Sequence, residues 1–171
     1  MGIHTTDFYL LGCTQELTTK AQYFYSIVHR HIPKITNSLA LLAHAAYETK
    51  FGRYMIPGSN SLFMMPATKT WSSSTVLYRV AEGSTTKSKA FRSYPTIGAA
   101  IKDYVRCIAT STKWPTLGPA LASASPTAYL EELLASGYYP EQCRVELFAT
   151  YFKLLEAHEK LGAHHGNQPQ S

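Results

Sequence analysis

The chain is short of the residues that build a disulfide framework or a structural zinc site. It has three cysteines, Cys13, Cys107 and Cys143, and no two of them stand at CxxC spacing. An odd number without that spacing indicates neither a complete disulfide set nor a zinc site. We interpret them as small buried thiols. The sequence leaves one pair open, Cys107 with Cys143.

Long apolar runs, dense basic runs and glycine-rich loops are missing too. No apolar run approaches membrane-spanning length, and residues 1–7 lack the basic start and apolar core of a signal peptide. We expect no membrane insertion, and delivery by a secretion machine or phage lysis for action outside the cytoplasm. The basic residues are spread singly, which argues against a nucleic-acid-binding stripe. Without a phosphate-binding glycine loop or a nucleophile elbow, we expect no cofactor.

What is present describes a globular domain. Of the 171 residues, 45% are hydrophobic and 16% charged, which is typical of a folded chain. The net charge of +5 favours an anionic partner, which could be nucleic acid, lipid or cell-wall polymer. We expect a single domain over residues 1–162 and a mobile tail over 163–171.

Apolar periodicity predicts a mainly α, α+β fold with one small hairpin. Residues 54–75 are rich in turn formers and read as a loop. The expected helices cover residues 14–32, 37–51, 95–108, 126–134 and 141–160, and the expected strands cover 76–81 and 90–94.

Glu48 stands near the end of the second expected helix. Apolar residues at 39, 42, 43, 46 and 47 define a buried face, and Glu48 lies at its edge. Gly52 is placed to follow the helix C-cap, which puts Glu48 in the last turn. There the negative end of the helix dipole and partial burial favour a protonated carboxyl group, as a general acid requires. The alternative is a solvated helix glutamate beside Lys50 and Arg53.

Carboxylates are scarce in the middle of the chain. Between Leu17 and Leu130 only Glu48, Glu82 and Asp103 occur. Asp103 reads as a solvated or ion-paired helix residue. Glu82 falls at the tip of the hairpin, where it is either an exposed turn residue or the partner of a helix acid across a cleft, the pairing that glycoside hydrolysis uses.

Histidines and aromatic residues support different conclusions. His44 is four residues before Glu48 but has no second ligand at metal spacing, so we expect no metal site and read it as a neighbour of Glu48 on the helix.

Aromatic residues outside the helical stripes suit a cleft for a carbohydrate polymer, because sugar rings stack on them. They are Phe63, Trp71, Tyr78, Phe91, Tyr94, Trp114, Tyr138 and Tyr139.

Four segments, in order, carry a resemblance. They are residues 42–52, Asn60 to Phe63 with Trp71 beyond it, Phe91 to Tyr94, and Gly137-Tyr138. They resemble the AQAALESGWG helix, the NNLFGIK loop with its following tryptophan, the FRxY strand and the start of the GYATDPxY motif of the glucosaminidase family of bacterial peptidoglycan hydrolases. That family belongs to the lysozyme-like superfamily.

The resemblance implies a lysozyme-like helical domain whose β-hairpin lobe flanks a substrate cleft. It implies that Glu48 is the catalytic acid, that Tyr138 positions the N-acetyl sugar, and that Phe63 lines the groove. We expect further substrate contacts from Asn60, Trp71, Tyr94 and Tyr139.

The departures concern the second half of the catalytic apparatus. Many members carry a glutamate in the first hairpin strand, where this chain has Leu77. Glu82 could replace it from the turn, or the substrate's 2-acetamido group could assist. Met64 stands in place of the loop glycine, and Tyr139-Pro140 replaces a longer motif.

The sequence therefore predicts an endo-β-N-acetylglucosaminidase that cleaves peptidoglycan glycan strands in the bacterial cell wall. The alternatives are muramidase specificity on the same fold and a non-catalytic peptidoglycan-binding module. A cognate inhibitor, or immunity, protein is an expected partner if the protein is an injected effector.

Overall fold

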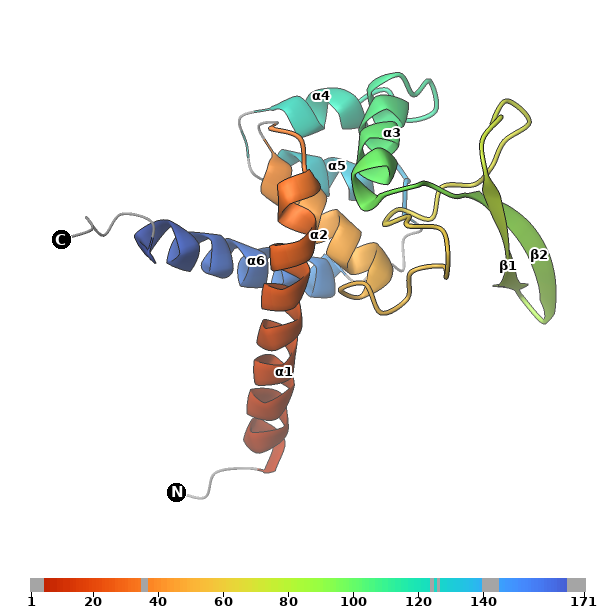
Figure 1. The fold of residues 1–171 in the computed structure, drawn as a ribbon. Helices are drawn as coiled ribbons and strands as arrows, with labels where there is room; N and C mark the ends of the chain where they lie inside the picture. The colour runs from red at the N-terminus through yellow and green to blue at the C-terminus, as the bar shows by residue number, and fades with distance from the viewer. Residues whose placement is uncertain (1–4, 35–36, 124, 126, 140–144, 166–171) are drawn as a thin grey trace.

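A helical body with a two-stranded hairpin at its side makes up the fold (Figure 1). The structure is a computed structural model, and it describes residues 5–34, 37–123, 125, 127–139 and 145–165; the side chains of 5–14, 82, 145–147 and 161–165 lie outside that description. The helices and strands are α1 (Thr5–Val28), the 3-10 turn η1 (His29–His31), α2 (Ser38–Thr49), β1 (Thr75–Glu82), β2 (Thr85–Arg92), α3 (Ile97–Ala109), α4 (Leu117–Ala122), α5 (Ala128–Ala135) and α6 (Val145–His165).

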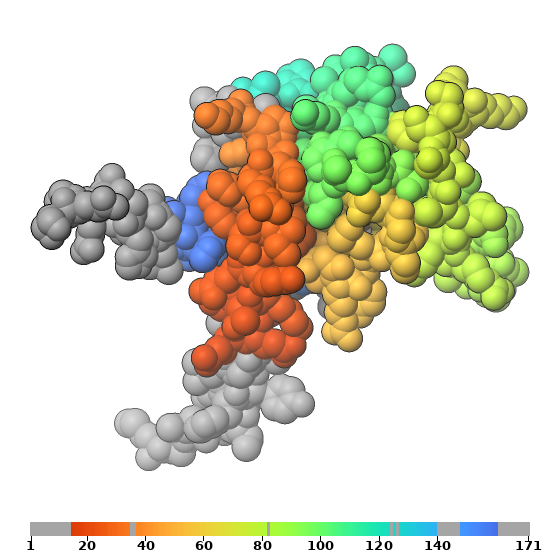
Figure 2. All heavy atoms as spheres, viewed as in Figure 1, coloured from red at the N-terminus to blue at the C-terminus, as the bar shows by residue number. Residues whose placement is uncertain are grey.

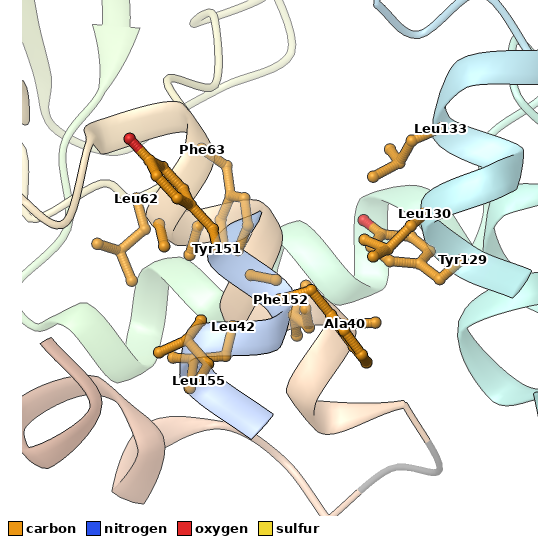
Figure 3. Packing of buried hydrophobic residues seen from close by; sticks show 14 of the residues in the cluster. Ala40, Leu42, Leu62, Phe63, Tyr129, Leu130, Leu133, Tyr151, Phe152 and Leu155 are labelled. Carbon is orange, nitrogen blue, oxygen red and sulfur yellow. The ribbon is translucent and has the colours of Figure 1, made fainter. Parts of the chain in front are cut away.

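Helix α2 is the centre of the body. It contacts α1, α4, α5 and α6, and residues 40–46 are all buried. Figure 3 shows Leu42 of α2 in one cluster with Phe152 and Leu155 of α6. The alanines of α2 let these neighbours approach closely, and burial on nearly every side fixes the direction of the helix and of Glu48 in its last turn.

The end of α2 differs from the expected glycine stop. The helix ends at Thr49, and Lys50, Phe51 and Gly52 follow with positive φ of 45°, 59° and 86°. The buried Thr49 hydroxyl donates to the Ala45 carbonyl and accepts the Gly52 N–H, so it satisfies groups that the helix end leaves open. Two residues other than glycine therefore start the reversal before Gly52 is reached.

Most other helices were predicted from the sequence, but their observed bounds differ from the predicted ones. Helix α1 begins at Thr5, nine residues before the expected start, because no proline interrupts that stretch. The short α4 was missed, since Gly118 and Pro119 are typical of loops. Helix α6 continues to His165, into the expected tail, and the last six residues of that tail lie outside the described part of the chain.

The hairpin has the expected position and is longer than expected. Its antiparallel register runs from Thr75 opposite Arg92 to Glu82 opposite Thr85, with Gly83 at a φ of 60° in the turn. Figure 2 shows the hairpin, in yellow to green, projecting from the side of the body. A bridge between Pro66 and Phe91 ties its base to the preceding loop.

Asp103 joins the hairpin to α3. Its carboxylate accepts hydrogen bonds from Arg92 at 2.6 Å, Arg106 at 2.5 Å and the Tyr94 hydroxyl at 2.8 Å. The side chain is only 10% exposed. The sequence prediction of an ion pair is confirmed, and the solvated alternative is wrong because Arg92, at the end of β2, and the following Tyr94 cover the carboxylate.

Gly118 lets α4 lie directly on the end of α3. A Cβ atom added there would stand 2.9 Å from the Ala109 Cα and 3.2 Å from the Ile108 carbonyl oxygen. Alanine improves helix propensity by up to about 1 kcal/mol, but overpacking typically costs about 1–3 kcal/mol. Because both neighbours are backbone atoms that cannot rotate away, Gly118→Ala should lower the free energy of unfolding by about 1 kcal/mol.

Urea unfolding followed by circular dichroism measures this loss. Ala122→Ser, at an exposed position of the same helix, is the matched control and should change stability by less than about 0.5 kcal/mol. Unchanged or increased stability of Gly118→Ala would contradict the close approach.

Candidate active site

Glu48 lies at the body's surface, next to the segment that follows α5. Its side chain is 17% exposed, and Oε1 accepts a hydrogen bond from the Tyr139 hydroxyl. Gly137, with a φ of 68°, ends α5 in the left-handed conformation and turns the chain back toward α2. Two segments 91 residues apart are thereby joined at a single carboxyl oxygen.

Tyr138 and Tyr139 both keep their hydroxyl protons at neutral pH. Burial, followed by the negative charge of Glu48, raises the pKa of each phenol well above its ordinary value of 10.0. A phenol held neutral beside a carboxylate is a hydrogen-bond donor. The Tyr139 hydroxyl donates its hydrogen bond to Glu48, so Tyr139 contacts the proposed acid itself. Its expected contact with a sugar stays a prediction.

His44 stands one helical turn before Glu48 and is fully buried. Its Nδ1 lies 2.9 Å from the Tyr129 hydroxyl and 3.2 Å from the Tyr104 hydroxyl, and these two oxygens are 2.7 Å apart. Its Nε2 lies 3.4 Å from Glu48 Oε1. The ring is surrounded by the rings of Phe63, Tyr104, Tyr129, Tyr138, Tyr139 and Phe148.

A cavity of about 250 Å³ opens beside this cluster. Phe63, Met65, Trp114 and Tyr138 are among its lining residues. Glu48 does not line it, but Tyr138 is in ring contact with Tyr139, at 5.2 Å between centroids. The lining is mainly apolar and aromatic, which suits the C–H face of a sugar ring.

The loop after α2 is built to hold Phe63 in place. The Phe63 ring stacks on Tyr104 with centroids 3.9 Å apart. Asn60, with a φ of 50°, donates its side-chain N–H to the Tyr94 carbonyl at 2.8 Å. Met64 has a φ of 45°, so its backbone is left-handed at the position where the NNLFGIK motif has glycine.

Trp71 and Tyr94 lie together on the hairpin side. Their ring centroids are 5.5 Å apart, and the Arg92 guanidinium covers the Trp71 ring at 4.6 Å. The Trp71 indole donates to the Ser74 carbonyl, and the Tyr94 hydroxyl is used by Asp103. The structure thus assigns both rings to supporting the loop and the hairpin base, and their contact with a sugar stays a prediction.

The second carboxylate is not placed. Glu82 ends β1, and its side chain lies outside the described residues. Leu77, at the position of the glutamate found in the resembling family, is 76% exposed on β1. The role of Glu82 therefore stays a prediction.

Sequence reasoning missed Tyr104 and Tyr129. Both are buried residues of helices, Tyr104 on α3 and Tyr129 on α5, and their hydroxyls meet only in the folded chain.

Within the described residues, no cluster of three or more His, Cys, Asp or Glu is arranged to hold a metal. Cys107 is a free thiol that accepts a hydrogen bond from Arg92 at 3.3 Å. In the described part of the chain, no helix has the length and apolarity needed to cross a membrane.

The mainly α fold with a hairpin at its side is shared with solved peptidoglycan hydrolases and glycoside hydrolase domains. A mutant peptidoglycan hydrolase from Sphingomonas sp. A1 superimposes with a TM-score of 0.69 at 21% identity, over 81% of this chain and 98% of that one. The glycoside hydrolase domain of FlgJ from Salmonella typhimurium gives 0.62 at 19% identity, over 96% of each chain.

A third similar structure is the catalytic domain of the autolysin Auto from Listeria monocytogenes, with a TM-score of 0.53 at 15% identity, over 91% of this chain and 89% of that one. No family of known sequences matches the chain, and neither does any curated protein. At these identities the likeness establishes the fold, and it confirms the fold that the sequence resemblance predicted.

Proposed function

We propose that the protein is a peptidoglycan hydrolase that cleaves the glycan strand as an endo-β-N-acetylglucosaminidase, with Glu48 as general acid. One observation carries the proposal. Glu48 is a partly buried carboxyl group in the last turn of the central helix, and a neutral phenol binds one of its oxygens. The similar structures named above supply the substrate class, because they are peptidoglycan hydrolases and a glycoside hydrolase domain.

In the reaction, the Glu48 carboxyl group donates its proton to the leaving glycosidic oxygen as the bond to the anomeric carbon breaks. The positive charge that develops on the sugar needs a second group. Glu82 can supply a carboxylate from the hairpin turn, or the substrate's 2-acetamido oxygen can attack the anomeric carbon. Tyr138 and Phe63 line the cavity where the N-acetyl sugar binds in this proposal.

Charge and setting agree with a cell-wall substrate. The net charge of +5 favours a polymer whose peptides and lactyl groups carry free carboxylates. We propose that the protein acts on the wall from the periplasm or outside the cell, after delivery by a secretion machine or during phage lysis. If a secretion machine delivers the protein, we propose a cognate inhibitor protein that covers the cleft as its partner.

A non-catalytic wall-binding module is the second candidate. The exposed Leu77 favours it, since this position supplies a carboxylate in the family that the sequence resembles. Such a module keeps the aromatic cavity but releases no product. Muramidase specificity on the same fold is a variant of the first candidate, and only the cleaved bond separates the two.

Digestion of purified sacculi distinguishes a glucosaminidase, a muramidase and a non-catalytic binding module. We expect the wild-type protein to release fragments with N-acetylglucosamine at the new reducing end, identified by borohydride reduction and mass spectrometry. Reduced N-acetylmuramic acid would assign muramidase activity instead. Sedimentation with sacculi in the absence of any released fragment would replace the enzyme by the binding module.

A further inference from the structure

The environment of His44 contains an unused polar atom beside the proposed acid. His44 Nε2 is buried and has no hydrogen-bond partner among the described residues. Burying such an atom without a partner is unfavourable, so native proteins seldom leave one without a reason. Glu48 Oε1, which can accept a hydrogen bond, lies 3.4 Å from it. This distance is a few tenths of an ångström beyond a normal N–H···O bond.

The opposite side of the ring decides where its single proton lies. Burial raises the pKa of both Tyr104 and Tyr129 well above 10.0, so each hydroxyl keeps its proton. Because these hydroxyls lie 2.7 Å apart, one donates to the other, and the second can donate to Nδ1 of His44 or to Tyr138, which also hydrogen-bonds Tyr104. Donation to Nδ1 leaves Nε2 to carry the ring proton, on the side of Glu48. This tautomer is part of the inference.

In this tautomer Oε1 of Glu48 accepts from the Tyr139 hydroxyl and has His44 Nε2–H 3.4 Å away. When Glu48 carries its proton as the general acid, the oxygen that faces these donors is the carbonyl-like one, so the acid proton lies on Oε2. When Oε2 passes its proton to the glycosidic oxygen, the carboxyl group becomes a carboxylate and negative charge develops on Oε1. The bond from Tyr139 then strengthens and His44 Nε2–H gains a charged acceptor, since bonds to charged acceptors are stronger than bonds to neutral ones.

We propose that His44 is a positioning residue that holds Glu48 Oε1 through Nε2–H, fixes the acid proton on Oε2 and stabilises the carboxylate that forms during the proton transfer. This inference rests on the proposed function of Glu48. Because the bond from His44 gains strength only as charge develops, its loss lowers kcat and leaves KM nearly unchanged.

Two amides separate this role from packing. Glutamine places an amide nitrogen near the position of His Nε2, so His44→Gln keeps a donor toward Glu48. Asparagine places its amide near Nδ1, so His44→Asn keeps a partner for the tyrosines and loses that donor. On sacculi we expect His44→Asn to lower kcat by about 10- to 100-fold, and His44→Gln to stay within about 5-fold of wild type. Thermal unfolding of both variants controls for stability.

Equal kcat in the two variants, both folded, overturns the positioning role. A wild-type measurement tests the same point without any variant: the ring ¹⁵N shifts of His44 should report a proton on Nε2, and a proton on Nδ1 overturns the inference. Failure of the proposed function has a different signature, since Glu48→Gln would then keep activity. An inactive Glu48→Gln beside a fully active His44→Asn overturns only the role of His44.

Discussion

Glu48→Gln should lower the rate of fragment release from peptidoglycan sacculi by at least ~100-fold, the scale of a lost general acid. Glutamine has the same shape and can still accept the Tyr139 hydrogen bond, but it has no proton of suitable acidity to give to the leaving oxygen. The side chain lies at the surface end of α2, at 17% exposure, so the substitution should leave the fold intact. The measurement is the initial rate of new reducing ends at equal protein concentration, with circular dichroism to verify folding.

A matched control is Glu131→Gln on α5, where the glutamate is exposed. We expect this variant to keep wild-type activity, because a distant surface charge takes no part in the proton transfer. Glu82→Gln then examines the second group: a loss comparable to that of Glu48→Gln assigns it the second carboxylate, and an effect within a few-fold assigns assistance to the substrate. Equal rates for wild type and Glu48→Gln would reject Glu48 as the acid.

The elements of the fold were predictable where a periodic apolar pattern meets a clear stop. Helix α3 is one example: it was expected over 95–108 and found over Ile97–Ala109, with the Thr96 side chain accepting from Ala99 N–H at its start. Helix α4 has no such pattern and was missed. It forms because Gly118 lets it pack on α3, and that is a tertiary effect which propensity does not record.

The site was predictable one residue at a time and not as a network. Helical spacing brought out Glu48 and its neighbour His44, since positions four apart share a face. The sequence could not show that Tyr104 and Tyr129 meet behind His44, because these residues are 25 positions apart and belong to different helices. Nor could it show that Tyr139 bonds to Glu48 across 91 positions. Hydroxyls on apolar stripes look like core aromatics until the packing of the helices is known.

Asp103→Asn should lower the free energy of unfolding by about 3 kcal/mol, the cost of leaving one member of a buried ion pair without its partner. Asparagine can still accept from Tyr94, but it removes the charge that balances Arg92, whose side chain is only 11% exposed. For a chain of this size we expect the melting temperature to fall by about 10 °C. Glu156→Gln, which breaks an exposed pair with Lys160, is the matched control and should cost less than about 0.5 kcal/mol.

The pH dependence of stability should carry the same signature. Burial acts to raise the pKa of the Asp103 carboxyl group, but hydrogen bonds from Arg106, Tyr94 and Arg92 outweigh it and hold the pKa below the ordinary 3.8. A carboxyl group with a lowered folded-state pKa adds stability above its unfolded value and loses it as the pH falls through the folded value. Between about pH 5 and pH 3 the wild type should therefore lose more stability than Asp103→Asn. Parallel curves for the two proteins in denaturant titrations would show that Asp103 is not the group responsible.

Arg92 also ends β2 and covers Trp71. Loss of the Asp103 charge should therefore loosen the base of the hairpin before the helical core unfolds, and amide exchange at residues 75–92 would reveal it.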